Sequence, residues 1–232
     1  MDRKAFYASL RTSLFKGGVS QQQVDGIETL LDQLEKSAVD LEKSAYILAG
    51  VYHETGAKMV PVREGFASTD AGARAAVKKL FDKGRIKTNY AAPVNGVSYY
   101  GRGRIQNTWH KNYEKLEKRF GHPFVRNPDL LLDDKIDAEV TVIGHVEGIW
   151  TGKKLADYIG GGRKDYKGAR RIVNGTDKAT MIAGYAESFE KALISSGYTG
   201  KPRPATETPV TPSAKAGWVS ALIALITRIF KR

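Results

Sequence analysis

The chain has 232 residues and a formal net charge of +12 at pH 7. This length is enough to bury one full core and to carry an appendage. The absence of cysteine excludes disulfides and thiolate metal sites, and the cationic surplus predicts an anionic partner such as nucleic acid, an acidic membrane or the bacterial envelope.

Helical spacing of apolar residues predicts a mainly α-helical chain in which any sheet is small. The predicted helices cover residues 4–15, 20–36, 43–55, 70–82, 109–120, 134–148 and 176–195. Their predicted N-caps are Ser20, Asp70, Asp133 and Thr176. Residues 158–168 contain three consecutive glycines and are predicted to form a flexible loop, without the Gly-Lys-Ser/Thr sequence that phosphate binding would need.

The helix predicted over residues 43–55 ends in a candidate catalytic acid. Apolar side chains at Ile47, Leu48, Val51 and Tyr52 indicate that this helix is buried. Burial at the inner end of such a helix would favour the protonated form of Glu54, which suits the donation of a proton.

A second carboxyl group follows ten residues later. Glu64 lies beyond Pro61 and beside Gly65, where we expect an open loop, and the neighbouring Arg63 would favour its ionised form. A glycosidic bond is cleaved by two carboxyl groups in different protonation states, so the pair suits acid and base roles. Taken alone, either glutamate is more typical of a solvated or capping residue.

Residues 99–109 combine glycines, aromatic rings and amides in one loop. Gly101 and Gly103 allow tight turns and close approach to a ligand. The flat rings and paired amides that suit sugars are Tyr99, Tyr100, Trp109, Gln106 and Asn107. The alternatives are a glycine turn packed in the core and an RNA-binding loop, but no nucleic-acid-binding module surrounds it, so we expect no nucleic-acid partner.

These segments resemble family 19 glycoside hydrolases, the chitinase-like branch of the lysozyme superfamily, and especially phage endolysins of that family. The matching segments are residues 52–56, 61–64, 99–109, 127–130 and 170–176, in the order of the family. The resemblance runs over about residues 40–195. It implies a lysozyme-like, two-lobed helical domain with a cleft.

The resemblance also implies roles for individual residues. Glu54 matches the catalytic acid, Glu64 falls near the general base, and Arg63 matches an arginine treated as part of the active site in such endolysins. The implied substrate contacts are Gln106 and Thr108, which bind sugar and hold the attacking water, Asn174, which grips substrate, Arg171, which orders the cleft, and Tyr100, which lines it.

Three positions depart from the family pattern. Arg104 replaces a proline or apolar residue, Asn107 replaces leucine, and Thr108 replaces serine while keeping the hydroxyl. Arg104 and Asn107 are therefore predicted to influence the choice of substrate.

The C-terminal part differs in composition from the rest. We expect a catalytic domain over residues 1–197, a Pro/Thr-rich linker over 198–215 and a cationic apolar helix over 216–232. Trp218 at one end of the last segment and Arg228, Lys231 and Arg232 at the other predict contact with an anionic membrane or the outer envelope. The alternatives are packing on the catalytic domain and oligomerisation.

The prediction is thus a phage or prophage endolysin that hydrolyses β-1,4 bonds of peptidoglycan as a muramidase, with inversion and carboxyl groups ~6.5–9.5 Å apart. The four histidines show no ligand spacing, so we expect no metal and no cofactor, and we expect a monomer. No secretory signal is evident, which predicts accumulation in the host cytoplasm and passage to the periplasm and cell wall through a holin. The alternatives are a chitinase, a lytic transglycosylase using Glu54 alone, and a non-enzymatic cationic protein that permeabilises membranes.

Overall fold

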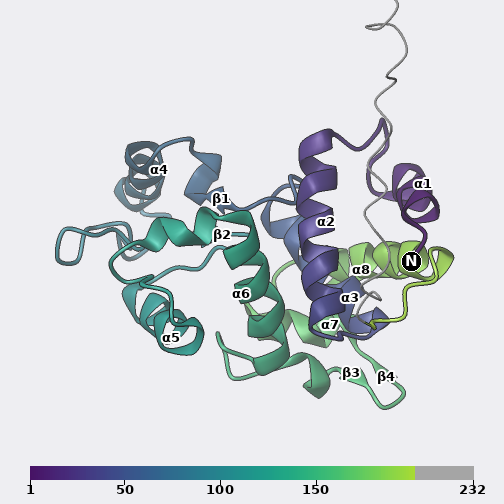
Figure 1. Ribbon diagram of the computed structural model, residues 1–232. Coiled ribbons are helices and arrows are strands. Elements are labelled where there is room, and N and C mark those ends of the chain that lie inside the picture. Colours follow the sequence, from purple (N-terminus) through teal and green to yellow (C-terminus); the bar gives the residue numbers. More distant parts are fainter. Residues whose placement is uncertain (202–232) are drawn as a thin grey trace, which may run out of the picture. The chain divides into compact units, whose positions relative to one another are not determined.

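The computed structural model describes residues 1–201 and consists mainly of helices (Figure 1). The helices described are α1 (Arg3–Ser13), α2 (Gln21–Lys36), α3 (Leu41–Glu54), α4 (Asp70–Asp82), α5 (His110–Phe120), α6 (Asp134–Glu147), α7 (Tyr166–Ala169) and α8 (Ala179–Ser195). Short 3-10 helices are η1 (Glu64–Phe66), η2 (Pro128–Leu132), η3 (Leu155–Asp157) and η4 (Arg170–Ile172). The mainly α prediction is confirmed, and each of the seven helices predicted between residues 4 and 195 is present.

Two helices begin at the caps that the sequence predicts. The Ser20 hydroxyl accepts from the backbone of Gln23, whose side chain accepts in return from the backbone of Ser20, so α2 opens with a complete capping box. The carboxylate of Asp133 accepts from two backbone N–H groups of the first turn of α6.

The other two cap predictions are wrong. Thr69, and not Asp70, caps α4 by accepting from the N–H of Gly72. Helix α8 begins after Lys178, whose left-handed backbone (φ 57°) turns the chain into the helix without a side-chain cap, so Thr176 lies outside it.

Helix α3 lies within the larger apolar cluster of the fold. Residues Ser44–Val51 are all buried, and the helix packs chiefly against α8, with α1, α2 and α7 contributing to the same cluster. A helix covered on all sides is fixed in position, so its last residue, Glu54, is held at the rim of the core.

Two smaller apolar clusters support the rest of the fold. One joins α5 to η2 and α6 through Tyr113, Leu116 and Leu131, and the other joins α4 to Tyr100 through Ala73 and Val77. Figure 1 shows α4 and α5 on one side of α6 and α1, α2 and α8 on the other.

The described strands form two very small antiparallel sheets. Strand β1 (Val62–Arg63) pairs with β2 (Arg102–Gly103), and β3 (Ile159–Gly160) pairs with β4 (Arg163–Lys164). The second pair and α7 lie where a flexible loop was predicted over residues 158–168, and that prediction is wrong. Gly161 and Gly162 form the turn of a hairpin, while Tyr158 and Tyr166 on either side are buried.

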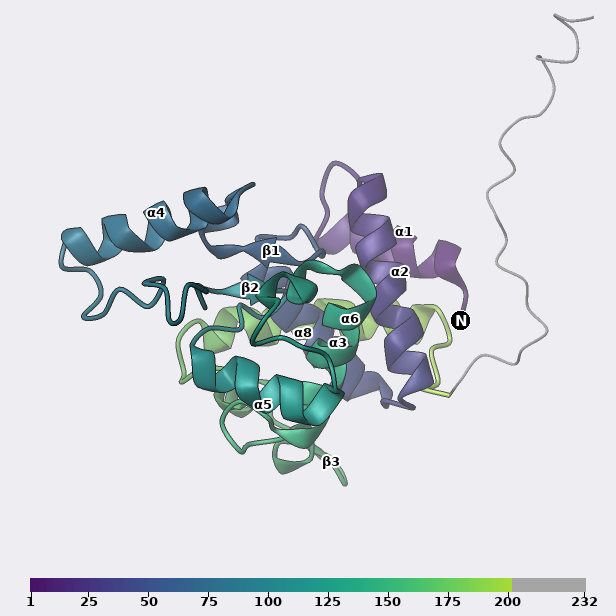
Figure 2. The same cartoon turned by 60° about the vertical axis from the view of Figure 1, so that its left-hand side comes forward.

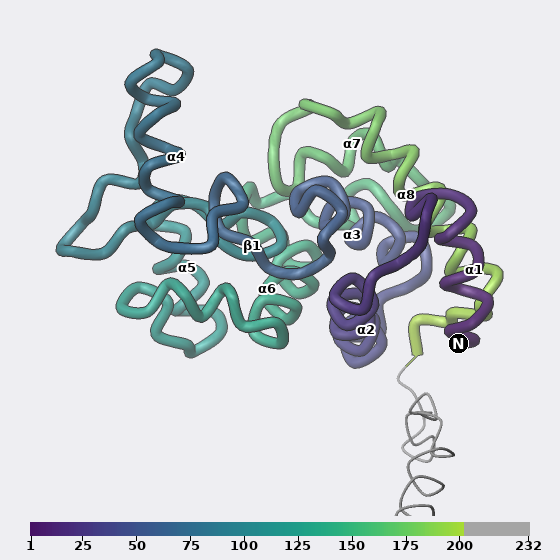
Figure 3. Tube along the Cα trace, turned by 90° about the horizontal axis from the view of Figure 1, so that it is seen from above, coloured from purple at the N-terminus to yellow at the C-terminus, as the bar shows by residue number. Residues whose placement is uncertain are grey.

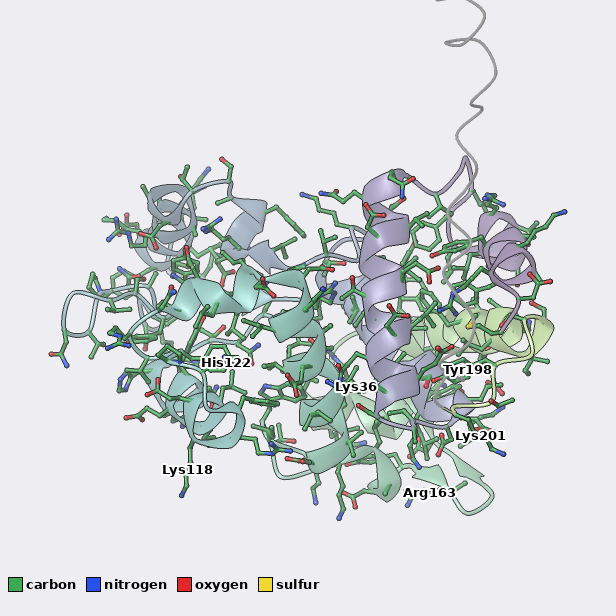
Figure 4. The ribbon with its side chains drawn as sticks, viewed as in Figure 1. Lys36, Lys118, His122, Arg163, Tyr198 and Lys201 are labelled. Carbon is green, nitrogen blue, oxygen red and sulfur yellow. The ribbon has the colours of Figure 1, made fainter. Side chains whose placement is uncertain are left out.

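The packed domain continues past the predicted end at residue 197. Tyr198, which is labelled in Figure 4, is buried. Its hydroxyl donates to the carbonyl of Val39 at 3.0 Å. A Cβ at Gly200 would approach the same carbonyl to 2.5 Å, so the backbone there lies tight against the domain. Most of the predicted linker and all of the helix predicted over residues 216–232 lie outside the described residues. Within residues 1–201, the helices are too short or too polar to cross a membrane.

Candidate active site

Glu54 is the last residue of α3 and its carboxylate is 20% exposed. Oε1 accepts a hydrogen bond of 2.6 Å from Nη1 of Arg170, whose side chain is 5% exposed. A buried cation therefore lies against this carboxylate, a partner that the apolar helix alone did not predict.

Arg170 is a site residue that the sequence analysis missed. Its Nε also donates to the carbonyl of Asp177 at 3.1 Å, so the same guanidinium ties Glu54 to the loop before α8. The prediction named Arg171 for this role, but the Arg171 side chain is exposed. The sequence shows two adjacent arginines, and which one faces inward depends on the single turn of η4, where Arg170 and Ile172 are the buried residues.

Glu64 directly follows β1 and faces the loop after Tyr100. Its N–H donates to the carbonyl of Gly101 at 2.8 Å, and the N–H of Gly101 donates back to Oε2 at 3.2 Å. The carboxyl group is half-buried rather than on an open loop. Burial raises the pKa of Glu64, although the N–H of Gly101 and the Tyr90 hydroxyl act in the opposite direction.

Arg63 contacts a different carboxylate from the one predicted. Its Nη2 donates to Oδ2 of Asp129 at 2.7 Å, and Arg102, opposite it on β2, donates through Nε to Oδ1 at 2.7 Å. Burial acts to raise the pKa of Asp129, but the hydrogen bonds from the two arginines hold it below its usual value. Arg63 therefore helps to hold β1 against β2. Among residues 1–201 it hydrogen-bonds to Ser68 and Asp129, and not to Glu64.

Three oxygens converge above the Cα of Gly101. The position that a Cβ would take there lies 2.7 Å from Oε1 of Gln106, 2.8 Å from Oε2 of Glu64 and 3.3 Å from Oγ1 of Thr108. The predicted base and the two residues predicted to hold water thus surround one point, which is open because residue 101 is glycine.

Backbone contacts fix the orientation of this group. Nε2 of Gln106 donates to the carbonyls of Val62 and Gly103, both at 3.0 Å, which turns Oε1 towards Glu64. The Thr108 hydroxyl donates to the carbonyl of Gln106 at 2.9 Å. Gln106 and Trp109 have left-handed backbone angles (φ 53° and 76°), which are costly for such side chains and often occur at functional sites.

The two predicted determinants of substrate choice are structural. Arg104 is fully buried and pairs with Asp134 and with Asp137, the latter at 2.9 Å. Asn107 is also buried, and its Oδ1 accepts from Nε1 of Trp150 at 2.8 Å. Neither side chain faces solvent, so neither is placed to contact substrate directly, and an influence on the choice of substrate stays a prediction.

Tyr100 and Asn174 have opposite environments. Tyr100 is fully buried, with the guanidinium of Arg102 stacked 3.6 Å from its ring centre, so the ring is covered and does not line an open groove. Asn174 is exposed one turn after Arg170, and its contact with substrate stays a prediction.

Exposed aromatic rings flank the two carboxyl groups. The Phe66 ring is 52% exposed and its tip lies 3.2 Å from the Cβ position of Gly56, two residues after Glu54. Trp109 is 44% exposed and lies beside Tyr90, with ring centres 5.5 Å apart. Phe66 and Tyr90 were not predicted as site residues, because neither lies in a segment that matches the family motifs.

Comparisons with known proteins give the same family for this region. Residues 37–151 match the family model of class I chitinases. A segment of 57 residues is 37% identical to an endochitinase of Brassica napus, covering 22% of this chain and 18% of that protein.

The fold was also compared with solved structures. Chitinase C of Streptomyces griseus aligns with a TM-score of 0.46 at 20% identity, over 85% of this chain and 78% of that one. A bacterial family 19 chitinase aligns with a TM-score of 0.47 at 18% identity, over 85% and 97%. Residues 37–151, which contain Glu54, Glu64 and the loop around Gly101, therefore form a family 19 glycoside hydrolase domain.

Proposed function

We propose that the chain hydrolyses β-1,4 glycosidic bonds of peptidoglycan by general acid and base catalysis. The observation that carries the proposal is the convergence of Glu64, Gln106 and Thr108 on one point above Gly101. Oε2 of Glu64 and Oε1 of Gln106 each lie less than 3 Å from that Cβ position, so they are close enough together for one water molecule beyond it to donate a hydrogen to each.

The role of Glu64 as the general base follows from this geometry. A water that donates one hydrogen to Oε2 of Glu64 and the other to Oε1 of Gln106 directs its lone pairs outward, towards the anomeric carbon of a bound sugar. Ionised Glu64 takes the proton as the water attacks. Gln106 and Thr108 hold the water but do not exchange protons with it.

Glu54 supplies the proton to the leaving oxygen. Its carboxyl group is held by Arg170 at the end of α3, and it acts in this proposal as the proton donor to the leaving oxygen. After the transfer, the same arginine stabilises the carboxylate that remains. Arg170 would therefore stabilise the transition state in which most of the proton has already left Glu54.

The reverse assignment is the second candidate. Burial raises the pKa of Glu64, which suits a proton donor, and a buried arginine contacts Glu54. The position of the water site beside Glu64 favours the first assignment. Glu54→Gln and Glu64→Gln separate the two, because a substrate with an activated leaving group bypasses the acid but still needs the base.

Peptidoglycan is proposed over chitin because of charge. The chain carries +12 at pH 7, and the peptides of the bacterial wall are anionic whereas chitin is neutral. A role in phage-induced host lysis, with a holin providing access to the wall, is part of the same proposal. Chitin oligomers are the alternative substrate.

The test is mass spectrometry of products from purified peptidoglycan with the wild type, Glu54→Gln, Glu64→Gln and the control Glu187→Gln, an exposed glutamate on α8. Reducing muramic acid ends that vanish in both site variants and persist in the control are expected. Reducing glucosamine ends would show a glucosaminidase. Anhydro ends, with Glu64→Gln still active, would show a transglycosylase, and activity on chitin oligomers alone would refute the choice of substrate.

A further inference from the structure

The segment from residue 67 to 98, here called the α4 arm, leaves the fold at the candidate active site and returns to it. It follows Glu64 and ends before Gly101, and these two residues are hydrogen-bonded to each other. Thirteen residues of α helix extend about 20 Å. Figures 2 and 3 show α4 running outward, with the following segment returning towards β2.

The arm carries an uncompensated positive charge. Its cations are Arg74, Lys78, Lys79, Lys83, Arg85 and Lys87. Its two carboxylates are already in use, since Asp70 pairs with Arg74 at 3.0 Å and Asp82 pairs with Lys78 at 2.6 Å. The remaining four cations are exposed and have no ion-pair partner among residues 1–201.

Two large apolar side chains stand among these cations. Leu80 is 39% exposed and Phe81 is 43% exposed, whereas the inner face of α4 buries Ala73 and Val77. Leu80 and Phe81 are absent from the three buried clusters of the described chain. The arm tip, defined as residues 78–87, therefore presents four free cations around an adjacent apolar pair.

We propose that the arm tip docks on an anionic phospholipid surface. A lipid interface offers phosphate groups and an apolar phase within a few ångströms of each other, which matches both features of the tip. Glycan strands and nucleic acids offer negative charge without an apolar phase into which Leu80 and Phe81 could partition. Each cation near such a surface strengthens partitioning by about fivefold, so four give a few hundredfold.

The experiment uses the full chain and a label at one position. Because the chain has no cysteine, Phe81→Cys gives a unique site for an environment-sensitive nitrobenzoxadiazole label. The control label is at Ile194→Cys on α8, which is 60% exposed and outside the arm. Both are mixed with vesicles of equal phosphatidylglycerol and phosphatidylcholine, and with vesicles of phosphatidylcholine alone. Cosedimentation reports binding of the chain as a whole.

Two charge variants complete the design. The tip variant changes four residues to glutamine, namely Lys79, Lys83, Arg85 and Lys87. The matched variant makes the same change of charge at exposed positions on α5 and α8, namely Lys111, Lys115, Lys118 and Lys191. Circular dichroism confirms that each variant is folded.

The expected result is a blue shift of the label at residue 81 on anionic vesicles only, with no shift at residue 194. Partitioning reported by that label should fall about a hundredfold or more in the tip variant and by less than tenfold in the matched variant. The proposal is overturned if the chain sediments with vesicles while the label at 81 stays unshifted, because another segment then binds. It is also overturned if partitioning onto vesicles falls equally in both variants. The same holds if the label at residue 81 responds to soluble peptidoglycan fragments or DNA but not to vesicles.

Discussion

Gly101→Ala tests whether the oxygens that converge above Gly101 hold the attacking water. The φ of Gly101 lies outside the left-handed region, so alanine fits the backbone, and the added methyl carbon is the only change. It would lie 2.7 Å from Oε1 of Gln106 and 2.8 Å from Oε2 of Glu64. Both oxygens would have to move by about 0.5 Å to reach an ordinary carbon–oxygen contact of ~3.3 Å.

The expected loss of activity follows from that displacement. The methyl group would lie against Oε2 of Glu64 and Oε1 of Gln106, so it would disturb the water that bridges them and shift the base. Misplacement of reacting groups on this scale costs about 10²-fold, and loss of base catalysis costs about 10²–10⁴-fold. We expect kcat/KM on peptidoglycan or chitin oligomers to fall at least about 10²-fold, with the chain still folded.

A double-mutant cycle with Glu64→Gln makes the assay specific. If the methyl group acts through the water and the base, Gly101→Ala should cost only a few-fold more in the Glu64→Gln background. Gly184→Ala, at a helical position with open space around it, is the control and should keep full activity. Activity of Gly101→Ala within about threefold of the wild type, or an equal loss in both backgrounds, would refute the water site.

Three further predictions concern the buried ion pair, a buried histidine and the tail. Asp137→Asn leaves Arg104 with one buried charge partner fewer and should lower the free energy of unfolding by about 3–5 kcal/mol in urea denaturation; an effect below about 1 kcal/mol would contradict the pairing. Burial lowers the pKa of His145 to about 4, so the unfolded chain gains a proton near pH 6.5 and the folded chain does not. Stability should therefore fall by about 2 kcal/mol between pH 7 and pH 5, and this fall should disappear in His145→Gln. Truncation after Lys215 removes the apolar cationic segment and should weaken cosedimentation with anionic vesicles; unchanged binding would exclude that segment as an anchor.

The helices could be predicted because their signals are local. The capping box of Ser20 and Gln23 and the apolar stripe that follows lie within one stretch of sequence, and so does the buried run before Glu54. The hairpin over residues 159–164 was missed because its glycines suggested flexibility, while the burial of Tyr158 and Tyr166 depends on distant parts of the chain.

The two carboxyl groups could also be proposed from the sequence, but not their surroundings. Arg170 lies 116 residues from Glu54, and nothing local to either residue indicates their contact. Arg104 was predicted to influence the choice of substrate, and its burial could have been anticipated from one feature of the sequence. Asp137 occupies a buried position of α6, and a carboxylate there needs a cationic partner.

The distribution of these ion pairs explains how such short strands can hold an active site. Strands β1 and β2 have two residues each, too few for their backbone hydrogen bonds alone to fix the loop between residues 99 and 109. Three arginines instead fasten the loop and its neighbours: Arg63 and Arg102 share Asp129, and Arg104 reaches the start of α6. Two of these guanidinium groups are almost fully buried, so salt screens them little, and the left-handed turns of the loop are held at ionic strengths that would weaken surface pairs.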